Sequence, residues 1–240
     1  MGSREFIRVL EARYGGSQAL TTCTNCWNAR YVSVDGAQCV AKLIVYISGD
    51  AAWNKRQDKR FAMERYVYAR LPRSWPVTLV ESFRSPMGPC IVTTSYDDTG
   101  WASYVQSDES DRVVAKKLLA QLASIHRLGV AHADLELKNV LFSRPADVAI
   151  IDFEKSVRCA AGGRMQVNDY TKLLRSLCQR TNTRGVCFYV IKYLMRGGKT
   201  QEAREAFIAS VGYIADEAGK WHDAEVARMR REDAEKEGPT

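Results

Sequence analysis

The sequence has few histidines, no export signal and no long hydrophobic run. It contains only three histidines, and CTNC (23–26) has no second CxxC to complete a zinc site, which argues against zinc. The longest apolar runs, such as CVAKLIVYI (39–47), carry a lysine and are too short to span a bilayer, so no membrane partner is expected. The N-terminal segment MGSREFIRVLEARY lacks the apolar block of a signal peptide.

The composition is that of a globular protein with anionic partners. Apolar residues make up 46% and charged residues 26% of 240 residues, a length sufficient for one large domain or two small lobes. The formal net charge of +7 favours binding of a nucleotide, a phosphorylated substrate or nucleic acid. The seven cysteines are odd in number and irregularly spaced, so we expect reduced thiols in a cytoplasmic or nuclear protein.

Residues 1–95 are predicted to form a small β-rich lobe with one inserted helix. ARYVSV and AQCVAKLIVYI are joined by Asp35 and Gly36, a pair typical of a two-residue hairpin turn. The spacing of apolar residues over 51–71 predicts the helix. The other expected strands are ALTTC (19–23), VTLVESF (77–83) and CIVTTSY (90–96).

Residues 96–240 are predicted to form a helical lobe. The segment 111–129 is strongly periodic and ends at Gly129. Two short strands, NVLFS and DVAIIDF, follow, and Asn168 or Asp169 is placed to cap a helix that continues to residue 180. Further helices are expected over 184–198 and 200–221, ahead of a charged tail. The apolar stripe of the first helix consists of Val114, Leu118, Leu122 and Ile125.

The loop HADLELKNVLF (132–142) concentrates side chains that a simple turn does not require at this spacing. It holds His132, Asp134 and Asn139. The apolar stretch VAII (148–151) that follows it leads to a further acid, Asp152. Amide and carboxylate oxygens are the hard ligands that magnesium prefers. Each residue alone fits a turn or a strand end equally well. Together they indicate a site for magnesium and a nucleoside triphosphate.

The order of the motifs resembles that of the protein-kinase-like fold over most of residues 18–180. LASIHRLGVAHADLELKNVLF resembles the family's helix and catalytic loop, and IIDFE resembles its metal-binding strand end. VAKL resembles the strand with the phosphate-binding lysine, and FAMERYVYARL resembles the helix with the paired glutamate. The resemblance implies an α+β bilobal fold, with a small antiparallel sheet lobe that carries one helix and a reduced helical lobe.

The resemblance also implies a catalytic role for five polar residues. Asp134 would accept or orient the proton of an attacking hydroxyl. Asn139 and Asp152 would bind magnesium. Lys42, aimed by an ion pair with Glu64, would bind the α- and β-phosphates of ATP.

Supporting residues follow from the same resemblance. His132 and His126 are expected to brace the catalytic loop rather than transfer protons, and Asp169 resembles the capping aspartate that holds the loop backbone. The adenine would lie beside Val40 or Ala41. It would bond to the backbone near Thr94, Ser95 and Tyr96.

The phosphate-covering loop departs from the family pattern. TTCTNCWNA (21–29) has no glycine, although glycines let backbone amides approach phosphates closely. Either the loop sits farther from the phosphates, or Thr22, Thr24 and Asn25 donate side-chain hydrogen bonds in place of those amides. This departure favours a pseudokinase, a module that binds a nucleotide or a partner without catalysis.

Other departures lie around the catalytic loop. Glu154 replaces the glycine of the usual metal-binding triplet, which should limit flipping of the motif and could place the acid near a second metal or an arginine. Ala133 and Glu136 replace a common arginine and lysine, and Lys138 is a candidate for the lost charge. The short interval from Asp152 to Asp169 leaves no room for a long activation segment.

These features are similar to those of compact atypical kinases such as the RIO, Kae-associated and lipopolysaccharide-kinase relatives. The leading interpretation is an ATP- and magnesium-dependent phosphotransferase. Its acceptor would be a hydroxyl on a protein serine or threonine, or on a small molecule. Besides the pseudokinase, an RNA-associated ATPase stays open, because the chain is basic and compact.

Overall fold

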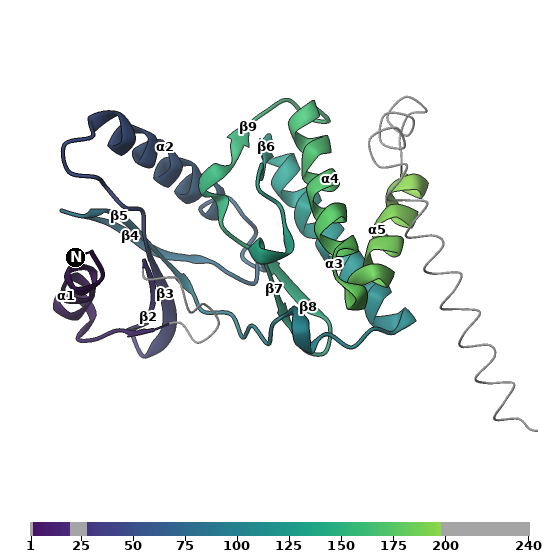
Figure 1. The fold of residues 1–240 in the computed structure, drawn as a ribbon, viewed down its shortest axis with the longest axis horizontal. Coiled ribbons are helices and arrows are strands. Elements are labelled where there is room, and N and C mark those ends of the chain that lie inside the picture. Colours follow the sequence, from purple (N-terminus) through teal and green to yellow (C-terminus); the bar gives the residue numbers. More distant parts are fainter. Residues whose placement is uncertain (1, 20–27, 198–240) are drawn as a thin grey trace, which may run out of the picture.

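The computed structural model describes residues 2–19 and 28–197. A sheet lobe is followed by a helical lobe, as Figure 1 shows, and the expected α+β bilobal fold is confirmed. Some of the predictions concern residues outside the described ranges. These are the side-chain hydrogen bonds of Thr22, Thr24 and Asn25, the absence of a zinc site at the CxxC of 23–26, and the helix and charged tail after residue 199.

The sheet lobe is a five-stranded antiparallel sheet with strand order β1-β2-β3-β5-β4. Asp35 and Gly36 form the β2–β3 turn, and their φ angles of 49° and 81° are those of the predicted hairpin. The elements are α1 (Gly2–Tyr14), β1 (Gln18–Ala19), β2 (Ala29–Val34), β3 (Ala37–Leu43), α2 (Ala51–Tyr68), β4 (Leu79–Ser85) and β5 (Gly88–Thr94).

Helix α1 is not predicted from the sequence, which indicates no helix before residue 51. Phe6, Leu10 and Tyr14 are spaced by four residues, so they share one face of the helix. Phe6 and Leu10 are fully buried in a cluster with residues of β2, β3 and β5. Tyr14 donates a hydrogen bond to Glu81 on β4, which ties the end of α1 to the sheet.

Helix α2 covers the opposite face of the sheet. Its Phe61 packs against Ile44 and Ile91, and the helix also contacts η3 (Phe153–Lys155) of the helical lobe. Successive residues of a strand point to opposite faces. Ala41 therefore packs under α1, whereas Lys42 projects from the face that α2 covers.

The helical lobe is organised around α3. The predicted stripe of Val114, Leu118, Leu122 and Ile125 is confirmed, because all four side chains are fully buried. The elements are η1 (Trp101–Ser103), α3 (Asp108–Arg127), β6 (Val130–Ala131), η2 (Leu137–Asn139), β7 (Val140–Ser143), β8 (Asp147–Ile150), β9 (Val157–Arg158), α4 (Arg164–Cys178), η4 (Thr181–Thr183) and α5 (Arg184–Gly197).

Helix α4 begins earlier than the sequence predicts. Gly163 occupies the position before its first turn, so Asn168 and Asp169 lie inside the helix and cap neither end of it. Asp169 is fully buried, and it faces the catalytic loop instead.

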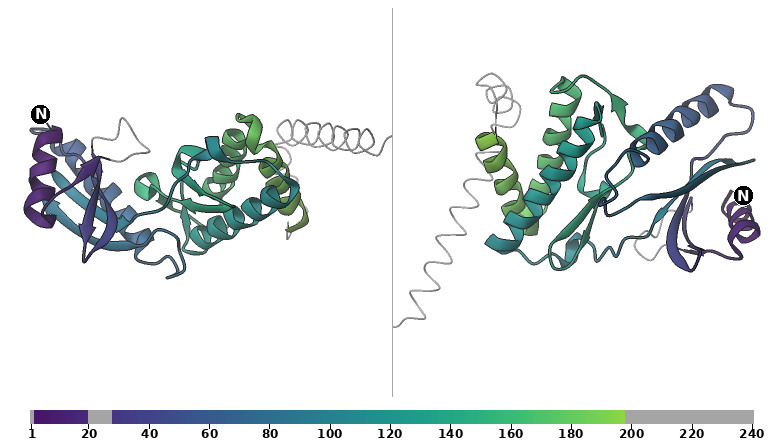
Figure 2. Two further views of the ribbon diagram at one scale, coloured as in Figure 1. Left: turned by 90° about the horizontal axis from the view of Figure 1, so that it is seen from below. Right: turned by 180° about the vertical axis from the view of Figure 1, so that it is seen from behind.

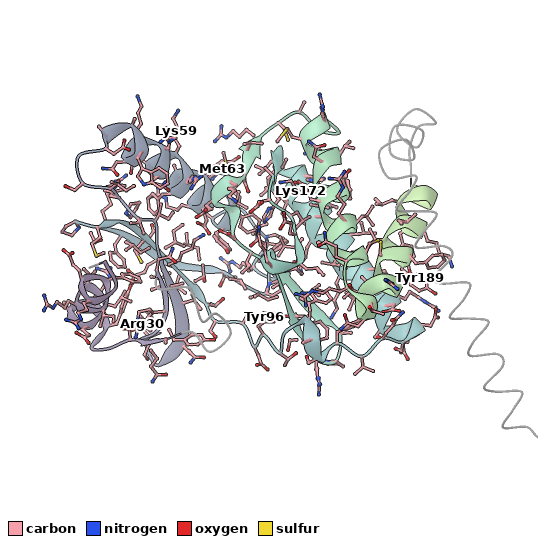
Figure 3. The ribbon with its side chains drawn as sticks, viewed as in Figure 1. Arg30, Lys59, Met63, Tyr96, Lys172 and Tyr189 are labelled. Atoms are coloured by element: carbon pink, nitrogen blue, oxygen red, sulfur yellow. The ribbon has the colours of Figure 1, made fainter. Side chains whose placement is uncertain are left out.

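The two lobes are joined by the chain that follows β5, and the right-hand view of Figure 2 shows this segment running from the sheet lobe to the helical lobe. Tyr96, labelled in Figure 3, lies on this connection, and its side chain packs against the core of the helical lobe. Among the described helices, none combines the length and the apolar character needed to cross a membrane.

Candidate active site

Lys42 and Glu64 form an ion pair between β3 and α2. The Lys42 ammonium lies 3.3 Å from both carboxylate oxygens of Glu64, which is almost completely buried. Burial raises the pKa of Glu64, and the positive charge of Lys42 opposes that rise. The structure therefore brings together the two residues expected to form the phosphate clamp.

Asp152 reaches the same ammonium from the helical lobe. It follows β8, adopts a left-handed backbone conformation with φ of 67°, and accepts a hydrogen bond from Lys42. Glu154 lies 3.2 Å from the same nitrogen. Burial alone would lower the pKa of Lys42, but Glu64, Asp152 and Glu154 together outweigh it and raise that pKa. Lys42 is thus held as a cation between the two lobes.

Asp134 and Asn139 lie on the loop between β6 and β7. The Asn139 amide nitrogen donates to the Asp134 carbonyl at 2.8 Å, which leaves the amide oxygen as a possible ligand atom. The Ile151 amide donates to the Asn139 carbonyl at 3.0 Å, so Asn139 and Asp152 lie at the same end of the β7–β8 pair. The structure thus places Asn139 and Asp152, the two expected metal ligands, at the same end of the β7–β8 pair.

The donor atoms fit a magnesium ion. Asn139 offers an amide oxygen, and Asp152 offers a carboxylate that is 29% exposed. Oxygens of Glu64, Asp152 and Glu154 lie within 4.8 Å of one another. All of these are hard oxygen donors, and magnesium sites usually combine one or two carboxylates with phosphate oxygens and water.

His132 connects the catalytic loop to the strand before Asp152. Its Nε2–H donates to the Ile151 carbonyl at 2.9 Å, and its Nδ1 accepts a hydrogen bond from the Asp134 amide at 3.3 Å. Burial lowers the pKa of His132, although the bond to Ile151 opposes this. Both ring nitrogens of a neutral imidazole are thus engaged in holding the backbone, which suits a bracing residue.

Asp169 holds the loop from the other side. Its carboxylate accepts hydrogen bonds from the backbone amides of His132 at 2.7 Å and Ala133 at 2.8 Å. His126 on α3 lies 3.0 Å from the same carboxylate. Ala133 has a φ angle of 65°, a conformation that costs energy for a residue with a Cβ. The buried aspartate stabilises this sharp turn immediately before Asp134.

Lysines surround the Asp134 carboxylate. Lys155 donates to it at 2.8 Å, and Lys138 and Lys172 lie 3.6 and 3.7 Å away. Burial alone would raise the pKa of Asp134, but the Lys155 hydrogen bond and the three positive charges hold that pKa below its usual value. Asp134 is therefore ionised at neutral pH. The sequence singles out Lys138 only.

The expected adenine contacts need correction. Ala41 is fully buried beneath α1 and faces away from Lys42, so only Val40 shares the face of the phosphate clamp. The amide of Thr94 already donates to Thr78 at 2.9 Å, and that of Ser95 donates to Gln38 at 3.2 Å. The N–H groups of Thr94 and Ser95 are thus engaged within the sheet lobe, and contacts of adenine with the backbone of residues 94–96 stay a prediction.

Glu154 links the two lobes through two cations. Besides Lys42, it lies 3.8 Å from Arg60 on α2, so the predicted nearby arginine is present. Sequence reasoning missed Arg60 as the partner, although it stands one helical turn before Glu64, at the spacing that places two side chains on one face.

Replacing Glu154 with glutamine should tighten ATP binding. Lys42 has three carboxylate partners, and removing one negative charge lowers the repulsion that a triphosphate meets there. We expect about fivefold lower Kd for Mg-ATP, which corresponds to about 1 kcal/mol. Titration calorimetry measures the change. Asp58→Asn, which removes a carboxylate of a surface pair with Arg84, is the control. A raised Kd for Glu154→Gln would mean that Glu154 binds a second metal.

The class of this protein follows from three features of the site. They are the ion pair of Lys42 with Glu64, the loop held by Asp169 and His132, and Asp152 at the end of its strand. The fold and site are those of a protein-kinase-like protein. Residues 98–193 match the model of the Lipopolysaccharide kinase (Kdo/WaaP) family. This match places the chain among the protein-kinase-like proteins and supports a phosphotransferase.

Two curated protein kinases are also similar to the chain. Phototropin-2 of Oryza sativa subsp. japonica is 26% identical over 110 residues, which is 43% of this chain and 12% of that protein. The Rho-associated protein kinase let-502 of Caenorhabditis briggsae is 29% identical over 115 residues, which is 45% of this chain and 10% of that protein. The matched region spans about a tenth of the length of each relative.

Proposed function

We propose that the chain is an ATP- and magnesium-dependent phosphotransferase that transfers the γ-phosphate to a hydroxyl group. The observation that carries this proposal is the contact of Lys42, from the sheet lobe, with Asp152, from the helical lobe. One is a cation suited to phosphate and the other an oxygen ligand suited to magnesium. A Mg-triphosphate bound between them would satisfy both groups at once.

In the proposed reaction, Asp134 accepts the proton of the acceptor hydroxyl as the hydroxyl oxygen bonds to the γ-phosphorus. The bond between that phosphorus and the β–γ bridging oxygen breaks, and ADP leaves with the electron pair. Lys42, aimed by Glu64, orients the α- and β-phosphates. Asn139 and Asp152 would hold magnesium, which neutralises phosphate charge when it is bound.

The adenine is proposed to bind on the sheet side of the connection between the lobes. Val40 shares the face of Lys42, and the backbone of Tyr96 follows the last paired residues of β5. A purine held by backbone groups needs no specific side chain at this position. This arrangement is consistent with the lack of a recognisable adenine motif in the sequence.

A small hydroxyl-bearing molecule is the acceptor that the chain path favours. Between Phe153 and Arg164, all of them described, the chain forms only η3, β9 and a short turn before α4. An extended peptide therefore has no long segment there to bind against. A protein serine or threonine is the other outcome of the test below.

The test is incubation with γ-labelled ATP and a panel of metabolites and cell lysate, with magnesium or with EDTA. Transfer of label to an alcohol only in the presence of magnesium supports the proposal and identifies the acceptor. ATP binding without any transfer or hydrolysis would favour a pseudokinase. Hydrolysis that RNA accelerates in a salt-sensitive manner would favour an RNA-associated ATPase.

We also propose a cytoplasmic or nuclear location. The proposal rests on the odd number and irregular spacing of the cysteines in the sequence. The sharpest test is the pair Cys178 and Cys187, whose Sγ atoms lie 2.9 Å apart. Detection of unmodified thiols in protein isolated under acid quench would support this proposal, and disulfides in that material would contradict it.

A further inference from the structure

Two of the three lysines near Asp134 have other partners. Lys172, which Figure 3 labels on α4, donates to the Ala133 carbonyl and so holds the loop backbone. Lys138 lies 2.9 Å from Glu136, closer than its 3.6 Å separation from Asp134. Neither Lys172 nor Lys138 makes its closest contact with the Asp134 carboxylate.

Lys155 differs from both because its ammonium bonds directly to Asp134. The distance to Oδ2 is 2.8 Å, and the lysine side chain is 45% exposed while that of Asp134 is 11% exposed. The ammonium therefore stands on the accessible side of a mostly buried carboxylate. A ligand that approaches Asp134 meets this cation.

The turn that carries Lys155 serves two parts of the site. Asp152 and Glu154 from this turn contact Lys42, where the α- and β-phosphates are proposed to bind. The next side chain, Lys155, contacts Asp134, where the acceptor hydroxyl is proposed to bind. In the proposed reaction, the γ-phosphoryl group moves from the nucleotide bound at Lys42 to the acceptor hydroxyl at Asp134. Lys155 contacts the second of these two residues and belongs to the turn that contacts the first.

We propose that Lys155 is a catalytic residue whose ammonium binds the phosphoryl group during its transfer. This inference rests on the proposed function. It is carried by the 2.8 Å contact of Lys155 with the Asp134 carboxylate, because Lys138 on the loop itself lies closer to Glu136 than to Asp134. A fixed cation at the position where charge develops stabilises a phosphoryl-transfer transition state without reorganisation.

The step balances without a further reactant. The acceptor oxygen bonds to the γ-phosphorus, its proton passes to Asp134, and the β–γ bridging oxygen keeps the electron pair of the bond that breaks. Lys155 keeps its proton throughout. Its hydrogen bond shifts from the Asp134 carboxylate toward an oxygen of the phosphoryl group, which frees the carboxylate to accept the proton.

The test uses a mimic of the transferred phosphoryl group, so it requires no known acceptor. The unfolding temperature of the full chain is measured with Mg-ADP and with Mg-ADP plus aluminium fluoride. The unmodified protein should gain further stability from the fluoride complex, because a site complementary to the transition state binds such analogues tightly. Lys155→Met should keep the shift with Mg-ADP and lose the additional shift. Lys155→Arg should restore part of it.

Hydrolysis of Mg-ATP provides the kinetic comparison. Lys155→Met should lower kcat by about 10²- to 10³-fold with little change in the KM for ATP, as expected for a group that acts on the transition state. Lys117→Met is the control, because it removes an exposed lysine that pairs with Asp147 at the surface, and its fluoride-dependent shift should match that of the unmodified protein. Lys138→Met tests the other lysine on the loop near the same carboxylate and should keep the fluoride-dependent shift.

The outcomes separate this inference from the proposed function. A protein that binds neither Mg-ATP nor Mg-ADP overturns the proposed function, and the role of Lys155 with it. Nucleotide binding without an additional fluoride shift in the unmodified protein overturns the role alone. The role is also overturned if Lys155→Met keeps that shift, or if Lys138→Met loses it instead.

Discussion

Replacing Asp134 with asparagine should remove phosphate transfer and leave Mg-ATP binding nearly unchanged. The substitution keeps the shape of the side chain and removes its capacity to accept a proton. Asp134 does not contact Lys42 in the structure, so the phosphate clamp should stay intact. Loss of a positioned general base typically costs about 10²- to 10⁴-fold in rate.

Transfer or hydrolysis of labelled ATP measures kcat, and calorimetry measures the Kd for Mg-ATP. Glu136→Gln is the matched control, because Glu136 lies on the same loop with a 41% exposed side chain that pairs with Lys138. It should retain activity. If Asp134→Asn turned over as fast as the unmodified protein, the assignment of Asp134 as base would be wrong.

Replacing Asp152 with asparagine should remove the dependence of ATP binding on magnesium. Asparagine tolerates the left-handed backbone conformation that Asp152 adopts, so the turn should form. The amide has no charge for a divalent cation and is a weaker ligand than the carboxylate. We expect the Kd for ATP in magnesium to rise at least about tenfold, since even residues behind metal ligands cost about 10- to 100-fold in affinity.

Calorimetric titration of ATP with magnesium or with EDTA measures this effect. Asp147→Asn is the control, because Asp147 begins β8, the strand that precedes Asp152, and pairs with Lys117 at the surface, 3.0 Å away. Its Kd should match that of the unmodified protein in both buffers. Equal magnesium dependence in Asp152→Asn and the unmodified protein would exclude Asp152 as a ligand.

The sequence predicts the elements of this fold well where one pattern dominates. The stripe on α3 has a helical period, and Asp35–Gly36 permits the positive φ angles of a tight hairpin. These features depend on neighbours within a few positions. Helix α1 was hidden because its two buried residues, Phe6 and Leu10, are few and only the sheet explains their burial.

The sequence predicts a set of residues for the candidate site but not the contacts among them. Lys42 and Asp152 are separated by 110 positions, and only the order of the motifs suggests that they meet. The sequence also left Val40 and Ala41 as alternatives beside the adenine, and strand alternation turns Ala41 to the face that α1 covers. Lys155 and Arg60 belong to no motif, since each contacts a partner that is distant in the sequence.

The most direct test of the central claim is the unfolding temperature with ATP alone, magnesium alone and both together. If Lys42 and Asp152 bind one Mg-triphosphate between the lobes, the two ligands together should stabilise the chain far more than either alone. A ligand at a hundred times its Kd contributes about 2.7 kcal/mol. An unfolding temperature that stays the same in all three conditions would contradict the account.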